Sequence, residues 1–355
     1  MVYRVIQWAT GAMGKTCLRA VIDHPDLELA GLYVYSAKKN GLDAGEIARR
    51  PTTGITATQR IEDILAIDAD VVLHCPLLQL PYSAHDEDVC RLLESGKNVI
   101  SINNYFFPPA LGDAHAARLQ ASCLAGGTTL AGTGINPGFI AERIAAVASG
   151  LCVELDFVTC REVYDCIEMP NANYVFGVMG MGSPPGKLDL KNGPLAQMFG
   201  AMYRQTVAHL AHLLGWTLDD IEADHATLLA PHDINARAGK IEAGTVAATT
   251  WQFHGIVQGK RVITHAVNWI MGSDLPGFES YNHWDIAIRG KPGIDIKMDL
   301  VEPVDASVKT RAAQYGVAGA VVNAIPQVVA APPGLFNAPM PPTFRPHLAP
   351  PFSSP

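Results

Sequence analysis

Apolar runs alternate with amphipathic stretches through the first third of the chain. The runs are short and almost continuous, as in strands buried on both faces of a parallel sheet, and the stretches between them have helical periodicity. The predicted strands are 3–8, 27–35, 70–75, 98–102 and 128–133, and the predicted helices are 15–23, 61–67, 84–95 and 113–125. This alternation predicts an N-terminal Rossmann domain, an α/β fold whose doubly wound parallel sheet gathers its strand-following loops at one edge.

The pattern changes after Gly138. An apolar helix is predicted at 139–149, a long helix at 195–214, and longer strands of alternating polarity at 153–162, 247–257, 261–271 and 281–288. The turn at 258–260 predicts a hairpin between the two middle strands. We expect a second, α+β domain built on an open mixed sheet. We also expect a homodimer, because an open sheet leaves one face free for a second copy to cover.

The C-terminal part is predicted in two pieces. A helix at 307–325 returns to the first domain, and the residues from Pro332 onward contain nine prolines without periodicity, which predicts an extended arm or a disordered tail. The predicted domains are 1–138, dinucleotide-binding; 139–305, substrate binding and dimerisation; 306–331, the returning helix; and 332–355, the proline-rich tail.

A glycine loop follows the first predicted strand. It is a G-x-G-x-x-G pattern with alanine in place of the first glycine, and it opens a helix. Free backbone N–H groups and the helix dipole at such a position can hold a pyrophosphate, although a plain strand-to-helix turn can carry glycines too. The residues predicted to bind the dinucleotide here are Thr10, Gly11, Ala12, Met13 and Gly14.

The end of the second predicted strand indicates which dinucleotide fits. NAD sites usually place an acidic residue there, but this chain has Ser36, Lys38 and Lys39 and no acid. A hydroxyl and two cations suit the 2′-phosphate of NADP(H), so NADP(H) is the preferred cofactor and NAD(H) a possible one. The other interpretation is a solvated lysine turn.

Two later turns at the same predicted sheet edge supply further candidate contacts. His74 and Cys75 end the third strand and are candidates for contact with ribose or nicotinamide. The turn 132–138 contains Gly134, which permits close backbone approach, and Asn136, whose amide offers a donor and an acceptor to the carboxamide or the substrate. Packing, for the first pair, and an interdomain hinge, for the turn, remain alternatives.

Composition and charge exclude several classes. Hydrophobic residues make up 48% of the 355 residues and charged residues 17%, which allows a large core, and the net charge of −8 argues against a nucleic-acid partner. The sequence predicts no membrane span and no signal peptide. Seven scattered cysteines without a C-x-x-C pattern indicate reduced thiols in the cytoplasm and no metal site, and the His209–His212 spacing has no further ligand nearby in sequence.

Four segments together resemble the dihydrodipicolinate-reductase-like superfamily: 9–14, 41–46, 132–138 and 322–326. Within it, residues 1–335 are most similar to 2,4-diaminopentanoate dehydrogenase and the native NAD(P)H-dependent amine dehydrogenases. The resemblance implies an NAD(P)H-dependent oxidoreductase that transfers hydride to or from a small, rather apolar carbonyl or imine. The His-His pair and the S-G-T-A turn of true dihydrodipicolinate reductases are missing, so their dicarboxylate is not the expected substrate.

The resemblance also exposes one departure. The amine dehydrogenase relatives place a glutamate just after the fourth strand of the sheet to hold ammonia or the amine, and here that place falls at Asn104. An asparagine is uncharged and cannot accept a proton near neutral pH, which disfavours reductive amination with free ammonia. Either Asn103 and Asn104 only orient a carbonyl or imine, or a different acid comes from the second domain.

His265 matches a position where the relatives carry an active-site histidine. With a pKa near neutrality it could donate a proton, and a half-buried strand histidine is the equal alternative. Tyr105 and Tyr174 are weaker candidate donors. The predicted catalytic residues are therefore Asn103, Asn104 and His265, and the predicted substrate contacts are Asn104, Tyr105, Asn136, Tyr174 and His265.

These residues favour a carbonyl or imine reductase with a small-molecule substrate. Two alternatives remain open: an ammonia-using amine dehydrogenase with a substitute acid, and a non-catalytic NADP(H)-binding sensor or degenerate paralogue. An interaction protein that uses the proline-rich tail is a third interpretation.

Overall fold

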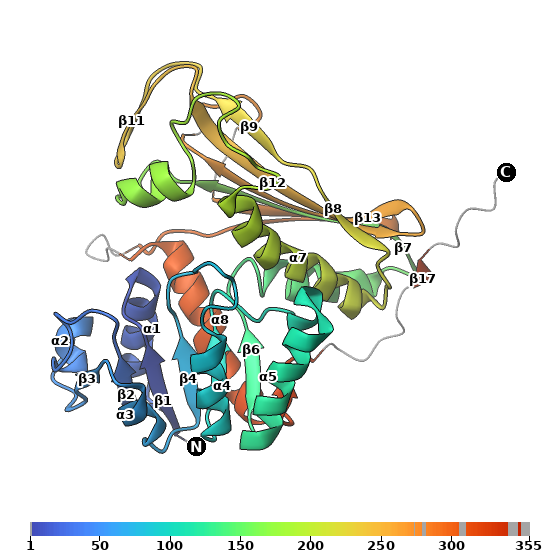
Figure 1. Ribbon diagram of the computed structural model, residues 1–355. Helices are drawn as coiled ribbons and strands as arrows, with labels where there is room; N and C mark the ends of the chain where they lie inside the picture. Colours follow the sequence, from blue (N-terminus) through green and yellow to red (C-terminus); the bar gives the residue numbers. More distant parts are fainter. Residues whose placement is uncertain (1, 273, 279–281, 305–309, 340–346, 349–355) are drawn as a thin grey trace. The chain divides into compact units, whose positions relative to one another are not determined.

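The chain forms two compact units in a computed structural model, which describes residues 2–272, 274–278, 282–304, 310–339 and 347–348. The first unit combines residues 1–139 with 301–339, and the second contains residues 140–300 with 340–355 (Figure 1). The domain boundaries predicted from the sequence, 138/139 and 305/306, lie within five residues of the observed ones. The helix after residue 310 thus belongs to the same unit as the N-terminal glycine loop.

A seven-stranded sheet, parallel throughout, forms the centre of the first unit. Its strand order is β16-β6-β5-β4-β1-β2-β3, so the chain winds outward from β1 in both directions. The strands are β1 (Tyr3–Trp8), β2 (Leu27–Tyr33), β3 (Ala57–Thr58), β4 (Val71–His74), β5 (Asn98–Ser101), β6 (Thr129–Gly132) and β16 (Gly334–Leu335). This order confirms the predicted doubly wound sheet.

Helices cover both faces of this sheet. Val5 points toward the apolar cluster that includes α1 and α8, whereas the next residue, Ile6, joins the cluster that includes α3, α4 and α5. Because both faces are buried, the strands read as continuous apolar runs. The helices are α1 (Ala12–Asp23), α2 (Ala44–Ala48), α3 (Ile61–Leu65), α4 (Asp86–Glu94), α5 (Asp113–Gly126) and α8 (Ala312–Val329), with a 3-10 turn η1 (Pro108–Leu111).

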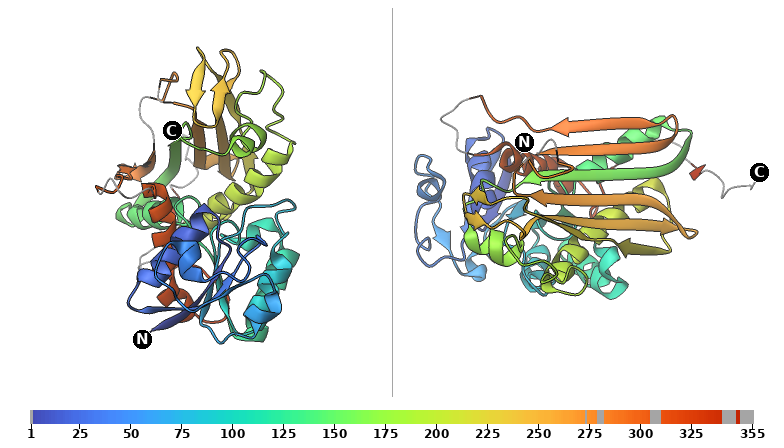
Figure 2. Two further views of the ribbon diagram at one scale, coloured as in Figure 1. Left: turned by 90° about the vertical axis from the view of Figure 1, so that its left-hand side faces the viewer. Right: turned by 90° about the horizontal axis from the view of Figure 1, so that it is seen from above.

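The second unit is built on an eight-stranded mixed sheet with the path β15-β14-β7-β13-β12-β8, to which β9 and β17 are added (Figure 2). β7 and β13 run parallel, and β12–β13 and β7–β14 run antiparallel, which confirms the predicted mixed sheet. The long elements are β7 (Glu154–Asp165), β12 (Val246–Val257), β13 (Lys260–Ile270), β14 (His283–Lys291), β15 (Ile294–Asp299) and the helix α7 (Pro194–Leu214).

Shorter elements complete the second unit. The hairpin between β12 and β13 forms as predicted, since Val257 pairs with Lys260 and Gln258 and Gly259 have φ of 52° and 72°, the left-handed values of a two-residue hairpin turn. The short strands, too brief or too polar for the sequence to reveal, are β8 (Asp220–Ala223), β9 (Ala226–Leu229), β10 (Ile234–Ala236), β11 (Gly239–Ile241) and β17 (His347–Leu348).

Three predicted segments differ in the structure. The helix expected at 139–149 is a π-helix, η2 (Ile140–Ala145), followed by α6 (Ala146–Ala148) and a 3-10 turn, η3 (Ser149–Leu151). The helix expected to end at 325 continues to Val329 through Pro326, and its predicted start at 307 lies outside the described residues. The tail is not structureless at its start, because β16 pairs with β6 there; residues 340–346 and 349–355 lie outside the described chain.

Candidate functional site

The glycine loop between β1 and α1 has the geometry that a bound dinucleotide requires. Ala9, in place of the first glycine, adopts φ +72°, a value that favours glycine. A Cβ at Gly14 would lie 2.2 Å from the Ala9 carbonyl oxygen, so only glycine fits there. A Cβ at Gly11 would meet nothing within 4 Å. The loop therefore packs tightly at its last glycine and is open at its middle one, where a pyrophosphate approaches the backbone.

The start of α1 suits an anion. Its N-cap is Gly11, no side chain caps the helix, and the first turn contains no acidic residue. The backbone N–H groups of Ala12, Met13 and Gly14 begin the helix, where the dipole favours negative charge. The predicted loop residues thus fit a dinucleotide pyrophosphate.

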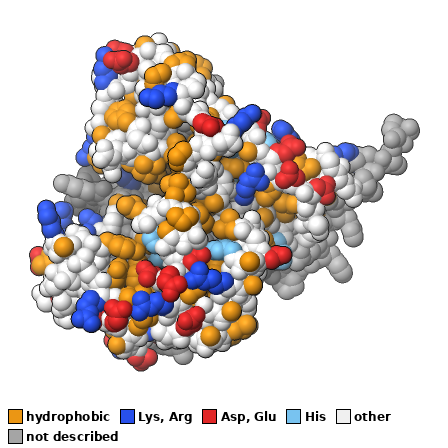
Figure 3. Space-filling model, in the orientation of Figure 1, with side chains coloured by type: hydrophobic (Ala, Val, Ile, Leu, Met, Phe, Trp, Pro, Cys, Tyr) orange, Lys and Arg blue, Asp and Glu red, His pale blue; other side chains and the backbone are white. Residues whose placement is uncertain are grey.

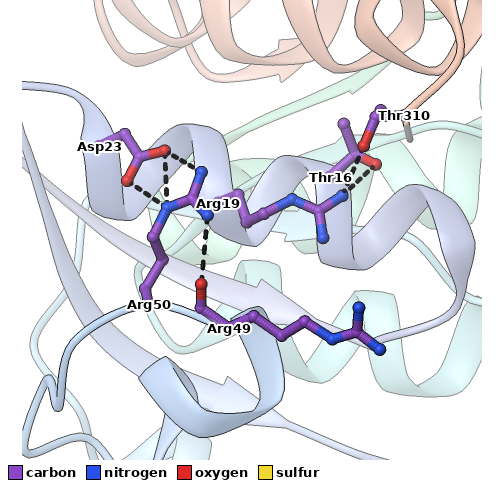
Figure 4. A network of polar contacts seen from close by, with 6 residues as sticks. All are labelled: Thr16, Arg19, Asp23, Arg49, Arg50 and Thr310. Carbon is purple, nitrogen blue, oxygen red and sulfur yellow. Dashed lines mark hydrogen bonds and ion pairs between the residues drawn. The ribbon is translucent and has the colours of Figure 1, made fainter. Parts of the chain in front are cut away.

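Two arginines fix the rest of α1 to its neighbours (Figure 4). Arg50, after α2, donates to the Asp23 carboxylate at the end of α1, with Nε 2.7 Å from Oδ1, and this bond lowers the pKa of Asp23. Arg19 donates to the hydroxyls of Thr16 and Thr310 at 3.2 and 3.1 Å. The helix that carries the phosphate loop is therefore tied to α2 and to the segment before α8.

Of the three residues predicted to read a 2′-phosphate, Lys39 lies at the glycine loop. Its Nζ donates to the carbonyl oxygen of Thr10 at 2.8 Å and to the Thr10 hydroxyl at 2.9 Å. Burial, and then the charge of Lys15, lower the pKa of Lys39. Ser36 and Lys38 are exposed in the same turn. Lys39 thus links the turn after β2 to the loop after β1.

The residues at the end of β4 point to opposite faces of the sheet. The Cys75 thiol lies 3.9 Å from that of Cys17 on α1, so Cys75 packs under the helix. His74 is fully buried, with Nδ1 3.1 Å from the Ser101 hydroxyl, and its Nε2 has no hydrogen-bond partner among the described residues. Burial, and then His85, lower the pKa of His74 well below its usual value, so its ring is neutral.

The turn after β5 presents one amide oxygen. The Asn104 side chain is 1% exposed, and its Nδ2 donates to the Tyr82 carbonyl oxygen at 2.8 Å. Its Oδ1 has no hydrogen-bond partner in the described part of the chain. Asn103 donates from its side chain to the Pro76 carbonyl and accepts from the Tyr82 hydroxyl at its own carbonyl. Asn103 therefore holds the turn, whereas Asn104 offers an acceptor.

Tyr105 faces away from this acceptor. Its hydroxyl donates to Asp86 Oδ1 at 2.9 Å, and burial, followed by the Asp86 charge, raises the pKa of Tyr105. The hydroxyl keeps its proton and gives its hydrogen bond to Asp86, so the prediction of Tyr105 as a proton donor to substrate is not supported. Sequence reasoning missed Tyr82 and Asp86, because their segment contains no recognisable motif.

The turn after β6 packs directly on the turn after β5. A Cβ at Gly132 would lie 2.4 Å from the Tyr105 carbonyl carbon and 2.5 Å from the Asn104 carbonyl oxygen. A Cβ at Gly134 would lie 2.9 Å from the Pro137 carbonyl oxygen, and Asn136 is half-buried in the same turn. Close packing of the two turns explains the glycines that the sequence singled out.

The remaining predicted site residues belong to the second unit. His265 is 1% exposed on β13, its ring lies 5.3 Å from that of Tyr203 on α7, and both ring nitrogens lack a hydrogen-bond partner within the described chain. Burial lowers its pKa to about 3, below the value near neutrality that the sequence suggested, and its catalytic role stays a prediction. Tyr174 lies in the π-helix η4 (Asn173–Val178), where burial raises its pKa.

The rest of the described chain was compared with the requirements of a metal site and of a membrane span. Within the described residues, no group of three or more histidine, cysteine or acidic side chains could hold a metal ion. No helix in that part of the chain is long and apolar enough to cross a membrane. On the face drawn in Figure 3, lysine and arginine side chains lie among acidic ones instead of gathering in a basic stripe. The candidate site is therefore the sheet edge after β1, β2, β4, β5 and β6.

Comparisons with known proteins agree with this geometry. An amine dehydrogenase of Streptomyces virginiae is 27% identical over 348 residues, 94% of each chain. A 2,4-diaminopentanoate dehydrogenase of Acetoanaerobium sticklandii is 25% identical over 341 residues, 94% of this chain and 92% of the relative. The solved amine dehydrogenase of Mycobacterium smegmatis shares the fold, with a TM-score of 0.75 and 20% identity over 94% of each chain.

The Rossmann sheet, the glycine loop and these relatives define an NAD(P)-dependent oxidoreductase. Residues 5–75 match the N-terminal domain of dihydrodipicolinate reductase. Residues 139–345 match the 2,4-diaminopentanoate dehydrogenase C-terminal domain, and the chain belongs to this family. The resemblance read from four motifs is confirmed, whereas the equivalence of Asn104 to the relatives' glutamate stays a prediction.

Proposed function

We propose that the protein transfers hydride between a nicotinamide dinucleotide and a carbon–nitrogen bond, and that it acts on a small imine or amine. The observation that carries the proposal is the buried Oδ1 of Asn104, which has no hydrogen-bond partner among the described residues. A buried acceptor without a partner is unfavourable, so a donor from a ligand at this atom would be stabilising.

The orientation of Asn104 favours nitrogen over oxygen in the substrate. Its amide nitrogen donates one of its two N–H groups to the Tyr82 carbonyl, and Oδ1 is the atom without a partner among the described residues. A ketone oxygen is itself an acceptor and cannot pair with Oδ1. An amine or a protonated imine carries N–H groups that can. The sequence alone ranked carbonyl and imine reduction together, and the unpartnered Oδ1 supports the imine or amine.

NADP(H) is the proposed cofactor, with NAD(H) as the alternative. Lys39 already lies at the glycine loop and brings a positive charge to the end of β2, while Ser36 and Lys38 stand exposed in the same turn. A 2′-phosphate there would receive charge-assisted hydrogen bonds. Thr10, Gly11, Ala12, Met13 and Gly14 would hold the pyrophosphate. His74, Cys75, Gly134 and Asn136 stay candidates for the nicotinamide end.

A homodimer in the cytoplasm is part of the proposal. One face of the second sheet carries half-buried, mostly polar side chains, such as Thr159 and Arg161 on β7 and Gln252 on β12. A second copy could cover this face. All seven cysteines are free and buried, which agrees with a reducing compartment.

The test follows NADPH absorbance with purified protein, first with a panel of preformed cyclic imines and then with ketones, with and without ammonium. Oxidation of NADPH by imines alone supports the proposal, and its loss in Asn104→Leu assigns it to Oδ1. Oxidation by ketones without ammonium contradicts it and supports carbonyl reduction. A requirement for ammonium would indicate a substitute acid, for which Glu142 and Glu162 are two buried carboxylates of the second unit. Tight NADPH binding without any oxidation would favour a sensor.

A further inference from the structure

Tyr105 has a left-handed backbone conformation, which residues other than glycine rarely adopt. Its φ is +66°, its side chain is 3% exposed, and it directly follows Asn104. Left-handed conformations are disfavoured for residues with a Cβ and persist only where the surroundings enforce them. Contacts within the first unit must therefore hold the Tyr105 backbone in this conformation. Because Asn104 is the preceding residue, the same contacts also affect the orientation of its side chain.

The Asp86 carboxylate supplies one such constraint. It accepts the Tyr105 hydroxyl at 2.9 Å through Oδ1, and its Oδ2 lies 3.2 Å from Nδ1 of His115. Asp86 is 3% exposed at the first position of α4, and His115 lies on α5. Asp86 thus ties the tyrosine hydroxyl to α4, and His115 ties the same carboxyl group to α5.

Backbone packing supplies a second constraint. Gly132 leaves no room between β6 and the backbone at Asn104 and Tyr105, since a Cβ there would come within 2.5 Å of both. The side chains of Asn103 and Asn104 each donate to a carbonyl of the segment after β4. The turn is thus fixed from several sides, and Oδ1 of Asn104 is the atom it leaves for a ligand.

We propose that Asp86 is a positioning residue that acts through Tyr105 to hold the Asn104 acceptor oxygen in its working direction. The inference rests on the proposed function of Asn104 and names no new contact with substrate. A hydrogen-bonding group displaced by about 1 Å can lower a rate by about a hundredfold. Loss of the contacts that hold Tyr105, here called the clamp, should therefore lower the turnover rate. His115 completes the clamp by pairing with the second carboxylate oxygen.

The first experiment compares Tyr105→Phe, Asp86→Ala and Asp86→Asn, with imine and NADPH as substrates. Tyr105→Phe and Asp86→Ala should lower kcat about tenfold with little change in NADPH affinity, because the turn loosens while the glycine loop is untouched. Asp86→Asn keeps an acceptor for the tyrosine hydroxyl and should recover kcat to within about threefold of the wild type. Arg118→Ala is the matched control, since its ion pair with Glu87 joins the same two helices at the surface.

A double-mutant cycle separates positioning from general damage. If Tyr105 acts through Asn104, then Tyr105→Phe in the Asn104→Ala background should change kcat/KM by less than about twofold. An undiminished tenfold loss in that background would overturn the inference, as would full activity of Tyr105→Phe alone. If Asn104→Ala itself is fully active, the proposed function fails, and the clamp fails with it. Tyr105→Phe keeps the test valid if Asp86→Ala does not fold.

Discussion

Asn104 and His265 are equally buried, at 1% exposure, yet they lie in opposite kinds of surroundings. Asn104 lies in a turn at the sheet edge of the first unit, where its amide nitrogen donates to a carbonyl and its oxygen has no hydrogen-bond partner among the described residues. His265 lies in the second unit, in a layer of aromatic side chains under α7 that includes Tyr203 and Phe253. Both side chains keep buried polar atoms without a partner among the described residues, so burial and missing hydrogen bonds do not by themselves mark a catalytic residue. The proposal for Asn104 rests also on its place after β5, at the carboxyl edge of the first sheet.

The most direct test of this difference makes the same substitution at both positions. Asn104→Leu should lower kcat/KM by about a hundredfold, on the order of 3 kcal/mol, because the acceptor for the substrate N–H is lost. His265→Leu should stay within about threefold of the wild type, because the ring contributes packing and no hydrogen bond. Steady-state kinetics with imine and NADPH measures both. A large loss in His265→Leu together with an active Asn104→Leu would reverse the assignment.

Gly132→Ala tests the packing behind Asn104. The new Cβ would come within 2.5 Å of the Asn104 and Tyr105 backbone, so the turn must move. We expect about a tenfold loss of kcat/KM and a destabilisation of roughly 2 kcal/mol, measured by denaturant unfolding. Gly319→Ala is the control within the same unit, since its Cβ would lie 4.0 Å from its nearest neighbour on α8 and should be neutral or stabilising. Wild-type activity in Gly132→Ala would show that the turn tolerates displacement.

The sequence predicted the sheet edge well, because the features that build it are local. The glycine loop, the strand that precedes it and the helix that follows it are adjacent in the chain, and apolar runs identify the other strands. The orientation of the side chains at this edge could not be predicted from the sequence. Whether Asn104 turns its oxygen or its nitrogen toward a ligand depends on the Tyr82 carbonyl, and whether Tyr105 faces substrate or Asp86 depends on a helix nineteen residues earlier.

The second unit was harder to predict for a related reason. Alternating polarity predicted the long strands. Strands β8 to β11 have three or four residues each, too few for an alternation of polar and apolar residues to be recognised. The environment of His265 depends on α7, some sixty residues earlier in the chain, whose Tyr203 covers the ring. From the sequence alone, a histidine in a strand of alternating polarity is expected to be half-buried, because the helix that covers it is not known.

The pH dependence of stability tests whether His265 is buried as a neutral ring. His265 is neutral in the folded protein with a pKa of about 3, whereas an unfolded histidine has a pKa near 6.5. The unfolded chain binds the proton first, so His265 does not affect the free energy of unfolding above about pH 6.5 and lowers it by roughly 1.4 kcal/mol per pH unit below that, toward pH 3. His265→Leu should remove this contribution, while that of His74 remains, and at neutral pH should stabilise the fold by about 1 kcal/mol. Urea unfolding between pH 4 and 7 measures both effects, and an unchanged slope in the variant would contradict the burial of a neutral ring.

The smallest expected effect concerns the turn after β2, where Lys39 contacts the glycine loop. Lys39→Ala should weaken NADPH binding by about fivefold and NADH binding by less than about twofold, because it removes a charge beside the proposed 2′-phosphate position and frees Thr10. Lys38→Ala is the companion variant, since Lys38 lies in the same turn but makes no hydrogen bond or ion pair within the described chain, so its loss removes a charge without freeing Thr10. Fluorescence titration with both dinucleotides gives the ratio. Equal losses for NADPH and NADH in Lys39→Ala would mean that the lysine only supports the glycine loop, and the cofactor preference would then have to come from Ser36 and Lys38.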